Sequence, residues 1–179
     1  MSTIVTTPTV RVIEGTWNAD PSHSTVEFAV KHMGFSTVRG RFLDFDATVE
    51  GGEEPALRGS IKLASVVTHD ESRDNHIKAP DFFDVERHPE ATVVATSIGE
   101  DRLVADVTLK GVTRPVEFSY RLSEPATDPW GNERMGLELE GEIDRTEFGV
   151  NWNNPLPNGE PALANDVTVV AELFFVKSA

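Results

Sequence analysis

Histidines and carboxylates are the side chains of this 179-residue chain that could do metal chemistry. Zinc and ferrous ions take imidazole and carboxylate ligands, and Asp20, Asp74 or Asp84 could supply the carboxylates. No two histidines have the HExxH spacing of a helical zinc site. We therefore predict no metal and no cofactor, and keep a metal- or cofactor-dependent enzyme built on His and Asp residues as the alternative function. The histidines are His23, His32, His69, His76 and His88.

Covalent catalysis also lacks a supporting residue pattern. Ser24 follows His23, but no nucleophile elbow surrounds the serine. The chain has no Cys, which excludes thiolate chemistry and disulfides. Neither a Gly-rich phosphate loop nor a dinucleotide-binding fingerprint is present. The residue pattern thus predicts a protein that is not an enzyme.

The charge of the chain excludes polyanionic partners. With a formal net charge of −14, it cannot form the basic surface that binds nucleic acid. Electrostatic docking on anionic membranes likewise needs clustered Lys and Arg. No apolar run is as long as a membrane span, and residues 1–15 lack the pattern of a secretory signal. We expect no integral membrane segment and a cytoplasmic location.

Alternation of apolar and polar residues dominates the rest of the chain and predicts β-strands. In the first strand Val26, Phe28 and Val30 share one face, and in the fourth Val94 shares a face with Ile98. The expected strands cover residues 24–32, 37–50, 57–67, 92–98, 103–109, 116–122, 137–143 and 166–176.

Eight strands joined mostly by short turns favour a closed antiparallel barrel, because a flat sheet would leave two bare edges. A phase change near Leu43 predicts a bulge in the second strand, and Gly40, Gly59 and Gly141 suit sharp bends. An eight-stranded barrel just holds its own side chains or one small ligand. A β-sandwich is the competing architecture. We predict an all-β fold, an eight-stranded antiparallel β-barrel.

One connection, residues 68–89 between the third and fourth strands, is too long for a hairpin and predicts a functional segment. Thr68 and Glu71 have capping-box spacing and Pro80 is a natural stop, so a short helix fits between them. Phe82 and Phe83 lie beside that helix in sequence and either plug the barrel end or contact a ligand. If a ligand enters the barrel, this connection is the expected gate.

Two polar pairs accompany the irregular segments of the chain. Arg73 and His76 fall on one face of the expected helix, since residues three and four apart are neighbours. Asp144 and Arg145 begin a second irregular stretch and form either an ion pair or a solvated surface pair. Together the four residues could hold a polar head group at the barrel mouth. Alternatively they form a structural network, which is favoured because buried charges need partners.

Dispersed motifs, in the same order along the chain, resemble those of the YceI-like family. The resemblance covers residues 16–176, and places a YceI-like domain over residues 16–179 after an irregular segment, residues 1–15. The motifs are DPSHS at 20–24, VEF at 26–28, KHM at 31–33, VRGRF at 38–42, SRDNH at 72–76, DFFD at 81–84, HP at 88–89, LKGVTRPV at 109–116 and DRTEFG at 144–149.

The resemblance implies a lipocalin-like barrel that binds a polyisoprenoid, quinone-like or fatty-acid-like molecule in its interior. The protein would act as a carrier or sequestering protein, and homodimers are common in the family. Many members are periplasmic and carry a leader, a pattern not visible in this sequence. A module that serves interaction alone is a third possibility. The candidate lipid-binding residues are Val26, Phe28, Val30, Phe42, Ile61, Leu63, Phe82, Phe83, Val94, Leu137, Phe148 and Trp152.

Overall fold

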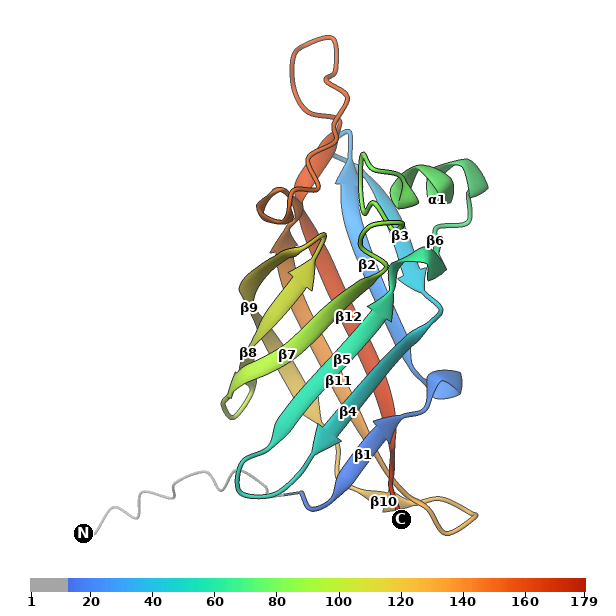
Figure 1. The fold of residues 1–179 in the computed structure, drawn as a ribbon, viewed down its shortest axis with the longest axis vertical. Coiled ribbons are helices and arrows are strands. Elements are labelled where there is room, and N and C mark those ends of the chain that lie inside the picture. The colour runs from blue at the N-terminus through green and yellow to red at the C-terminus, as the bar shows by residue number, and fades with distance from the viewer. Residues whose placement is uncertain (1–12) are drawn as a thin grey trace, which may run out of the picture.

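The computed structural model describes residues 13–179, and it confirms the all-β fold (Figure 1). All strands belong to one antiparallel sheet. They are β1 (Thr16–Ala19), β2 (Thr25–His32), β3 (Ser36–Phe42), β4 (Phe45–Glu50), β5 (Ala56–Lys62), β6 (Val66–Val67), β7 (Glu90–Ile98), β8 (Arg102–Leu109), β9 (Val112–Leu122), β10 (Ala126–Thr127), β11 (Glu133–Asp144) and β12 (Leu163–Lys177).

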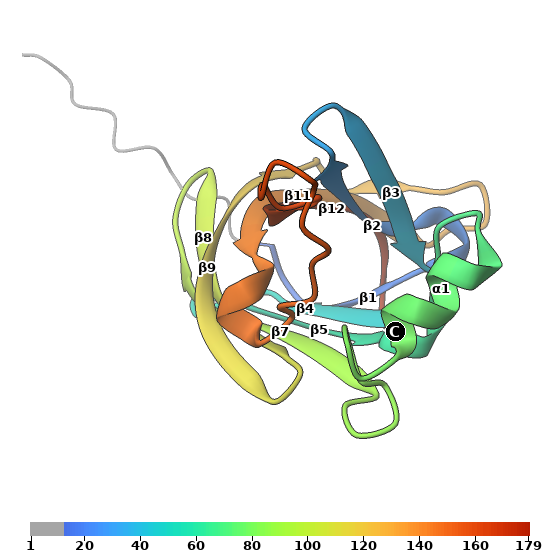
Figure 2. The same ribbon diagram turned by 90° about the horizontal axis from the view of Figure 1, so that it is seen from above.

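The sheet closes on itself as an eight-stranded antiparallel barrel. The ring runs β11–β9–β8–β7–β5–β4–β1–β12 and closes where β12 pairs with β11. One edge of β12 pairs first with β2 and then with β1, so these two segments act as one interrupted strand. Figure 2 looks along the barrel from the end that carries helix α1 (Glu71–Lys78), which we call the mouth.

The predicted second strand, residues 37–50, is two strands in the structure and not one bulged strand. The chain bends at Leu43 and Asp44, whose backbone N–H groups both donate to Ser65 Oγ at 3.1 Å. Before the bend β3 pairs with β2 and β6, and after it β4 pairs with β1 and β5. The phase change in the sequence therefore marks a change of pairing partners.

The prediction that Val94 of the fourth strand faces inward was wrong, because this residue is 49% exposed. In β7 it is Ala91, Val93 and Ala95 that pack toward the core. The register between β7 and β8 shifts after Ala95, and a shift of one residue moves every following side chain to the other face. Ile98 lies after the shift and packs inward. Counting back from Ile98 in steps of two therefore placed Val94 on the inward face, which was wrong.

Two of the glycines expected at bends instead make room for aromatic rings. Gly40 lies opposite Phe28 across β2 and β3, and Gly141 lies opposite Phe118 across β9 and β11. A Cβ at Gly141 would stand 2.6 Å from Phe118 Cδ1, and one at Gly40 would overlap the Phe28 ring. The missing side chains thus let both rings lie against the barrel wall.

The helix expected between the third and fourth strands is confirmed as α1. Its N-cap is Asp70 and not Thr68, because Asp70 Oδ1 accepts the Arg73 N–H at 2.9 Å. Thr68 instead donates from N at 2.8 Å and Oγ1 at 2.5 Å to Asp74 Oδ1. The helix ends at Lys78, and Ala79 before Pro80 takes extended backbone angles, as a residue preceding proline prefers. The side-chain bonds to Thr68 fix the helix to the strand before it.

The end of the barrel opposite α1 is closed by its own side chains. Trp17 of β1, Met135 of β11 and Phe175 of β12 are almost fully buried there. Met135 and Phe175 are paired across β11 and β12, and Trp17 pairs beside them with Lys177. Of the expected irregular segment, residues 1–15, only residues 13–15 are among those described.

Candidate functional site

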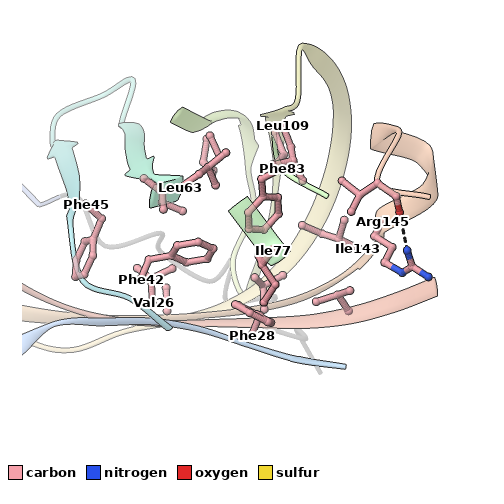
Figure 3. A pocket seen from close by; sticks show the side chains of 18 of the residues that line it. Val26, Phe28, Phe42, Phe45, Leu63, Ile77, Phe83, Leu109, Ile143 and Arg145 are labelled. Carbon is pink, nitrogen blue, oxygen red and sulfur yellow. Dashed lines mark hydrogen bonds between the residues drawn. The ribbon is translucent and has the colours of Figure 1, made fainter. Parts of the chain in front are cut away.

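A cavity of about 730 Å³ occupies the barrel interior between the closed end and the mouth. This size falls within the roughly 300–1,000 Å³ of typical small-molecule sites. Figure 3 shows Phe42, Phe83 and Ile77 directed into the same space, while Arg145 lies apart at one end of it. The lining is mostly aliphatic and aromatic, so the cavity offers an apolar surface to any molecule that enters it.

The structure brings most of the predicted lipid-binding residues together around this cavity. They come from three strands, the 3-10 turn after β5, the segment after α1 and the segment before β12. The predicted residues that line the cavity are Val26, Phe28, Val30, Phe42, Ile61, Leu63, Phe82, Phe83 and Trp152.

Three predicted residues lie outside the lining. Val94 is exposed on the outer face, because of the register shift in β7. Leu137 is buried nearer the closed end, two residues along β11 from Met135. Phe148 is buried in the 3-10 turn (Arg145–Phe148) after β11 and packs in the core.

Several lining residues were missed by the sequence-based selection. Leu139 and Ile143 share the predicted inward face of Leu137, and Val93 is the inward neighbour of Val94. The alternation within each strand carried a signal for Leu139 and Ile143. The strand β12 is rich in Val and Phe on both faces, so its sequence alone could not select Val167 and Val169.

An aromatic cluster joins the two segments that border the mouth. His76 of α1 contacts Trp152 edge-on, with ring centroids 4.8 Å apart, and Phe82 at 4.9 Å. Phe82 and Trp152 also contact each other at 5.3 Å. His76 Nε2 lies 3.1 Å from Asp81 Oδ2. Because Trp152 belongs to the segment before β12, this cluster links α1 to the opposite border of the mouth.

A second aromatic chain leads from the connection after α1 into the cavity. The Phe83 ring lies 6.1 Å from Phe42, and Phe42 lies 5.7 Å from Phe28. All three rings line the cavity. Phe82 and Phe83 therefore pack against the core at this end of the barrel and also line the cavity, and their contact with a ligand stays a prediction.

Arg145 is a buried structural residue, with only 5% of its surface exposed. Its guanidinium donates to four carbonyls, at 2.8 Å to Ala164 O, 2.7 Å to Val150 O, 2.8 Å to Trp152 O and 3.4 Å to Leu163 O. Burial lowers the pKa of Arg145 below its usual value. With so many donors used by the backbone, Arg145 mainly fixes the segment that carries Trp152.

Asp144 is not paired with Arg145 and does not line the cavity. Its Oδ1 accepts from Thr146 Oγ1 at 2.6 Å and from Thr146 N at 2.9 Å, capping the 3-10 turn. These hydrogen bonds hold the pKa of Asp144 below its usual range. Asp144 thus bonds within its own turn, whereas Arg145 bonds to carbonyls of residues 150–164, and the two side chains form no direct pair.

Arg73 borders the cavity but also has structural partners. Its Nε donates to Thr68 Oγ1 at 2.8 Å and its Nη2 to Thr68 O at 2.6 Å. Arg73, His76 and Arg145 line the same cavity, whereas Asp144 does not. Of the four predicted polar residues, three are thus brought to the mouth, and their bonds to neighbouring residues are those of a structural network.

The described residues hold no group of three or more His, Cys, Asp or Glu that could bind a metal ion. His23, for example, lies in the turn between β1 and β2 with Asp20, whose Oδ2 accepts from Arg134 Nη1 at 3.1 Å. Residues 13–179 also contain no helix with the length and apolarity needed to cross a membrane.

Solved structures share this fold across nearly their whole length. BcnA of Burkholderia cenocepacia superposes with a TM-score of 0.74 at 20% identity, covering 87% of this chain and 98% of that one. A polyisoprenoid binding domain of Saccharophagus degradans, implicated in plant cell wall breakdown, gives 0.63 at 16% identity, covering 90% and 98%. A YceI protein of Campylobacter jejuni gives 0.68 at 25% identity, covering 83% and 90%.

Sequence comparison identifies the family. A UPF0312 protein of Staphylococcus aureus strain USA300 is 34% identical over 161 residues, which cover 87% of this chain and 94% of the relative. The family model of the YceI-like domain matches residues 17–175, from the first strand of the barrel to the last. The chain therefore belongs to the YceI-like family.

Proposed function

We propose that this protein binds a long-chain apolar lipid of the isoprenoid type inside its barrel, and carries or sequesters it. The observation that carries the proposal is the cavity of about 730 Å³, lined mostly by apolar side chains and closed at one end. The polyisoprenoid binding domain of Saccharophagus degradans, which has the same fold, supports an isoprenoid as the ligand class.

The physics of the cavity favours long chains over short ones. Each CH₂ removed from water contributes roughly 0.8 kcal/mol. Association costs about 4–15 kcal/mol of lost freedom, so a chain of a few carbons barely binds. A long tail can exceed that cost without any directional contact. The ligand is therefore selected mainly by the length and width of its apolar part.

The polar groups at the mouth are hydrogen-bonded within the protein, so the head group of a ligand has a smaller role in binding than its apolar tail. The Arg145 guanidinium donates hydrogen bonds to four backbone carbonyls, and two side-chain nitrogens of Arg73 donate to Thr68. His76 has Asp81 as its partner. We propose that a head group lies near Arg73 and His76 at the solvent side and adds little to selectivity.

The aromatic cluster of His76, Phe82 and Trp152 serves as the gate in this proposal. It is the contact that joins α1 to the segment before β12 across the mouth. Arg145 holds that segment from below, through the carbonyls of Val150 and Trp152. Opening therefore requires α1 and its connection to move away from Trp152.

Neighbouring residues of β7 provide a matched test of interior binding. Val93 lines the cavity and Val94 faces solvent, so Val93→Trp fills the cavity whereas Val94→Trp adds the same ring outside. We expect Val93→Trp to weaken binding of geranylgeraniol by roughly tenfold or more, the loss of about two buried CH₂ groups. Val94→Trp should bind as the unmodified protein does.

The measurement is a titration of the purified protein with geranylgeraniol and with the shorter geraniol, together with native mass spectrometry and organic extraction. Tight binding of the longer alcohol alone supports the proposal. Equal effects of the two tryptophan variants, or a barrel that takes up neither alcohol and yields no lipid on extraction, would exclude interior binding.

Two expectations from the sequence stay predictions. The first is the homodimer implied by the family, which sedimentation velocity of the purified protein would check. The second is the cytoplasmic location, which rests on residues that lie mostly outside those described. Fractionation of cells that express the unaltered gene would check it.

A further inference from the structure

The borders of the mouth differ sharply in charge. The connection that carries α1, residues 68–89, contains six carboxylates and three Lys or Arg. Few charged residues occur at the other border, which is formed by the turn between β2 and β3 and by the segment between the last 3-10 turn and β12. Across residues 31–37 and 149–162, Lys31 and Glu160 are the only Asp, Glu, Lys or Arg. In a chain of net charge −14, this makes a locally neutral region at one border of the mouth.

The neutral border also exposes apolar side chains. Phe35 is 79% exposed and Met33 is 47% exposed, both at the tip of the β2–β3 hairpin. Met33 has a φ of 53°, in the left-handed region that bulky residues rarely adopt, and Gly34 follows with a φ of 79°. This tight turn, with His32 paired to Ser36, holds the two side chains outward.

The hairpin tip is attached to the mouth and not to a remote surface. Met33 N donates to Ala162 O at 2.7 Å, which joins the tip to the segment before β12. His32 and Val38, on either side of the tip, line the cavity. Figure 1 shows this hairpin and the segment before β12 reaching the same end of the barrel as α1. We call Met33, Phe35, Pro155 and Pro157, all exposed, the apolar rim.

We propose that the apolar rim rests on the surface of an uncharged phospholipid bilayer, so that a lipid passes between membrane and cavity without crossing water. The inference rests on the proposed function, since a long apolar ligand has its source in a membrane. Aromatic side chains such as Phe35 enter the interfacial layer favourably. Because the α1 connection at the same end is acidic, anionic lipids repel the protein.

The closed end offers a matched control for this surface. Trp130, 82% exposed, is the other strongly exposed aromatic ring among residues 13–179, and it lies in the β10–β11 turn near the closed end. Its neighbours include Asp128, which braces that turn through the backbone N–H groups of Trp130 and Asn132. If exposed aromatic rings bound membranes regardless of place, Trp130 would act as Phe35 does.

The first experiment is flotation of the ligand-free protein with protein-free phosphatidylcholine vesicles. We expect the unmodified protein to float, and Phe35→Ser to lower its partition by roughly tenfold, as expected when a phenylalanine ring no longer leaves water. Trp130→Ser should leave the partition unchanged, Phe35→Trp should retain it, and added phosphatidylglycerol should weaken it. Circular dichroism confirms that the variants are folded.

Three outcomes would overturn the proposal that the apolar rim binds a membrane. They are no flotation of the unmodified protein, equal losses for Phe35→Ser and Trp130→Ser, and binding only to vesicles that contain a membrane protein. Because flotation uses ligand-free protein, it succeeds or fails independently of cavity binding.

The second experiment follows transfer of a fluorescent isoprenoid from loaded protein to vesicles. Its rate should rise with vesicle concentration and fall in Phe35→Ser, while the affinity of that variant for the probe in solution stays unchanged. A rate independent of vesicle concentration would contradict transfer at the membrane. Failure of the probe to bind any variant would instead overturn the proposed function.

Discussion

The closed end and the mouth are built from the same strands but use them in opposite ways. At the closed end Trp17, Met135 and Phe175 fill the interior, and each is at most 2% exposed. At the mouth, aromatic rings line an open cavity and remain partly exposed. Since a buried ring stabilises the fold whereas a cavity does not, we expect stability to be concentrated at the closed end and the proposed binding at the mouth. Substitutions at the two ends should therefore separate stability from binding.

The largest expected effect is on stability at the closed end. Phe175→Ala removes a fully buried ring and should lower the free energy of unfolding by about 3–5 kcal/mol. Phe83→Ala at the mouth removes a partly buried ring beside a cavity and should cost less than half as much. Urea denaturation of both variants measures the difference. Equal losses would show that the two ends contribute alike.

An intermediate effect is expected on release of the ligand through the gate. Trp152→Ala removes two aromatic contacts, with His76 and with Phe82, each worth about 0.5–1.5 kcal/mol. If the cluster closes the mouth, release of bound geranylgeraniol should be roughly five- to a hundredfold faster in stopped-flow measurements, by the sum of those contact energies. Trp130→Ala at the closed end is the control and should not change release. An unchanged rate for Trp152→Ala would place the gate elsewhere.

The smallest expected effect is an acid sensitivity of the closed end. Although burial raises the pKa of Asp128, hydrogen bonds from Asn132 and Arg134 outweigh it and lower that pKa to about 2. A lowered pKa contributes stability above about pH 4, the unfolded value, and that stability is lost as the pH falls toward 2.

Asp128→Asn should therefore lose less stability than the unmodified protein between pH 4 and 2, starting from a lower value at neutral pH. Thermal unfolding at a series of pH values tests this. A parallel pH dependence of Asp128→Asn and the unmodified protein would contradict the assignment.

Much of the barrel could be predicted because the pleat of a strand is a local property, visible as period-two alternation. Val116 and Phe118, or Leu103 and Ala105, needed no knowledge of their partners to be placed inward, and both pairs are buried. The helix after the third strand was likewise visible in local signals, although the capping residue is Asp70. Local rules failed where pairing between strands intervenes, as at Val94, which lies before the register shift of β7.

The candidate site depended more on contacts between distant residues. Arg145 donates to the carbonyls of residues 150, 152, 163 and 164, and no residue spacing in the sequence predicts those partners. The contact of His76 with Trp152 likewise joins residues far apart in sequence. Such bonds follow from the folded geometry of the mouth, so the polar set could be chosen from the sequence but its role could not.

Alternation, charge and motif order were enough to establish an acidic eight-stranded barrel of the YceI-like family. Only the tertiary structure decided whether that barrel is filled or hollow. The space left by an inward side chain depends on the residues that lie opposite it across the interior. Trp17 and Phe175 are both fully buried and fill the closed end, whereas Phe28 and Phe118 lie over glycines against the wall and leave a cavity at the mouth.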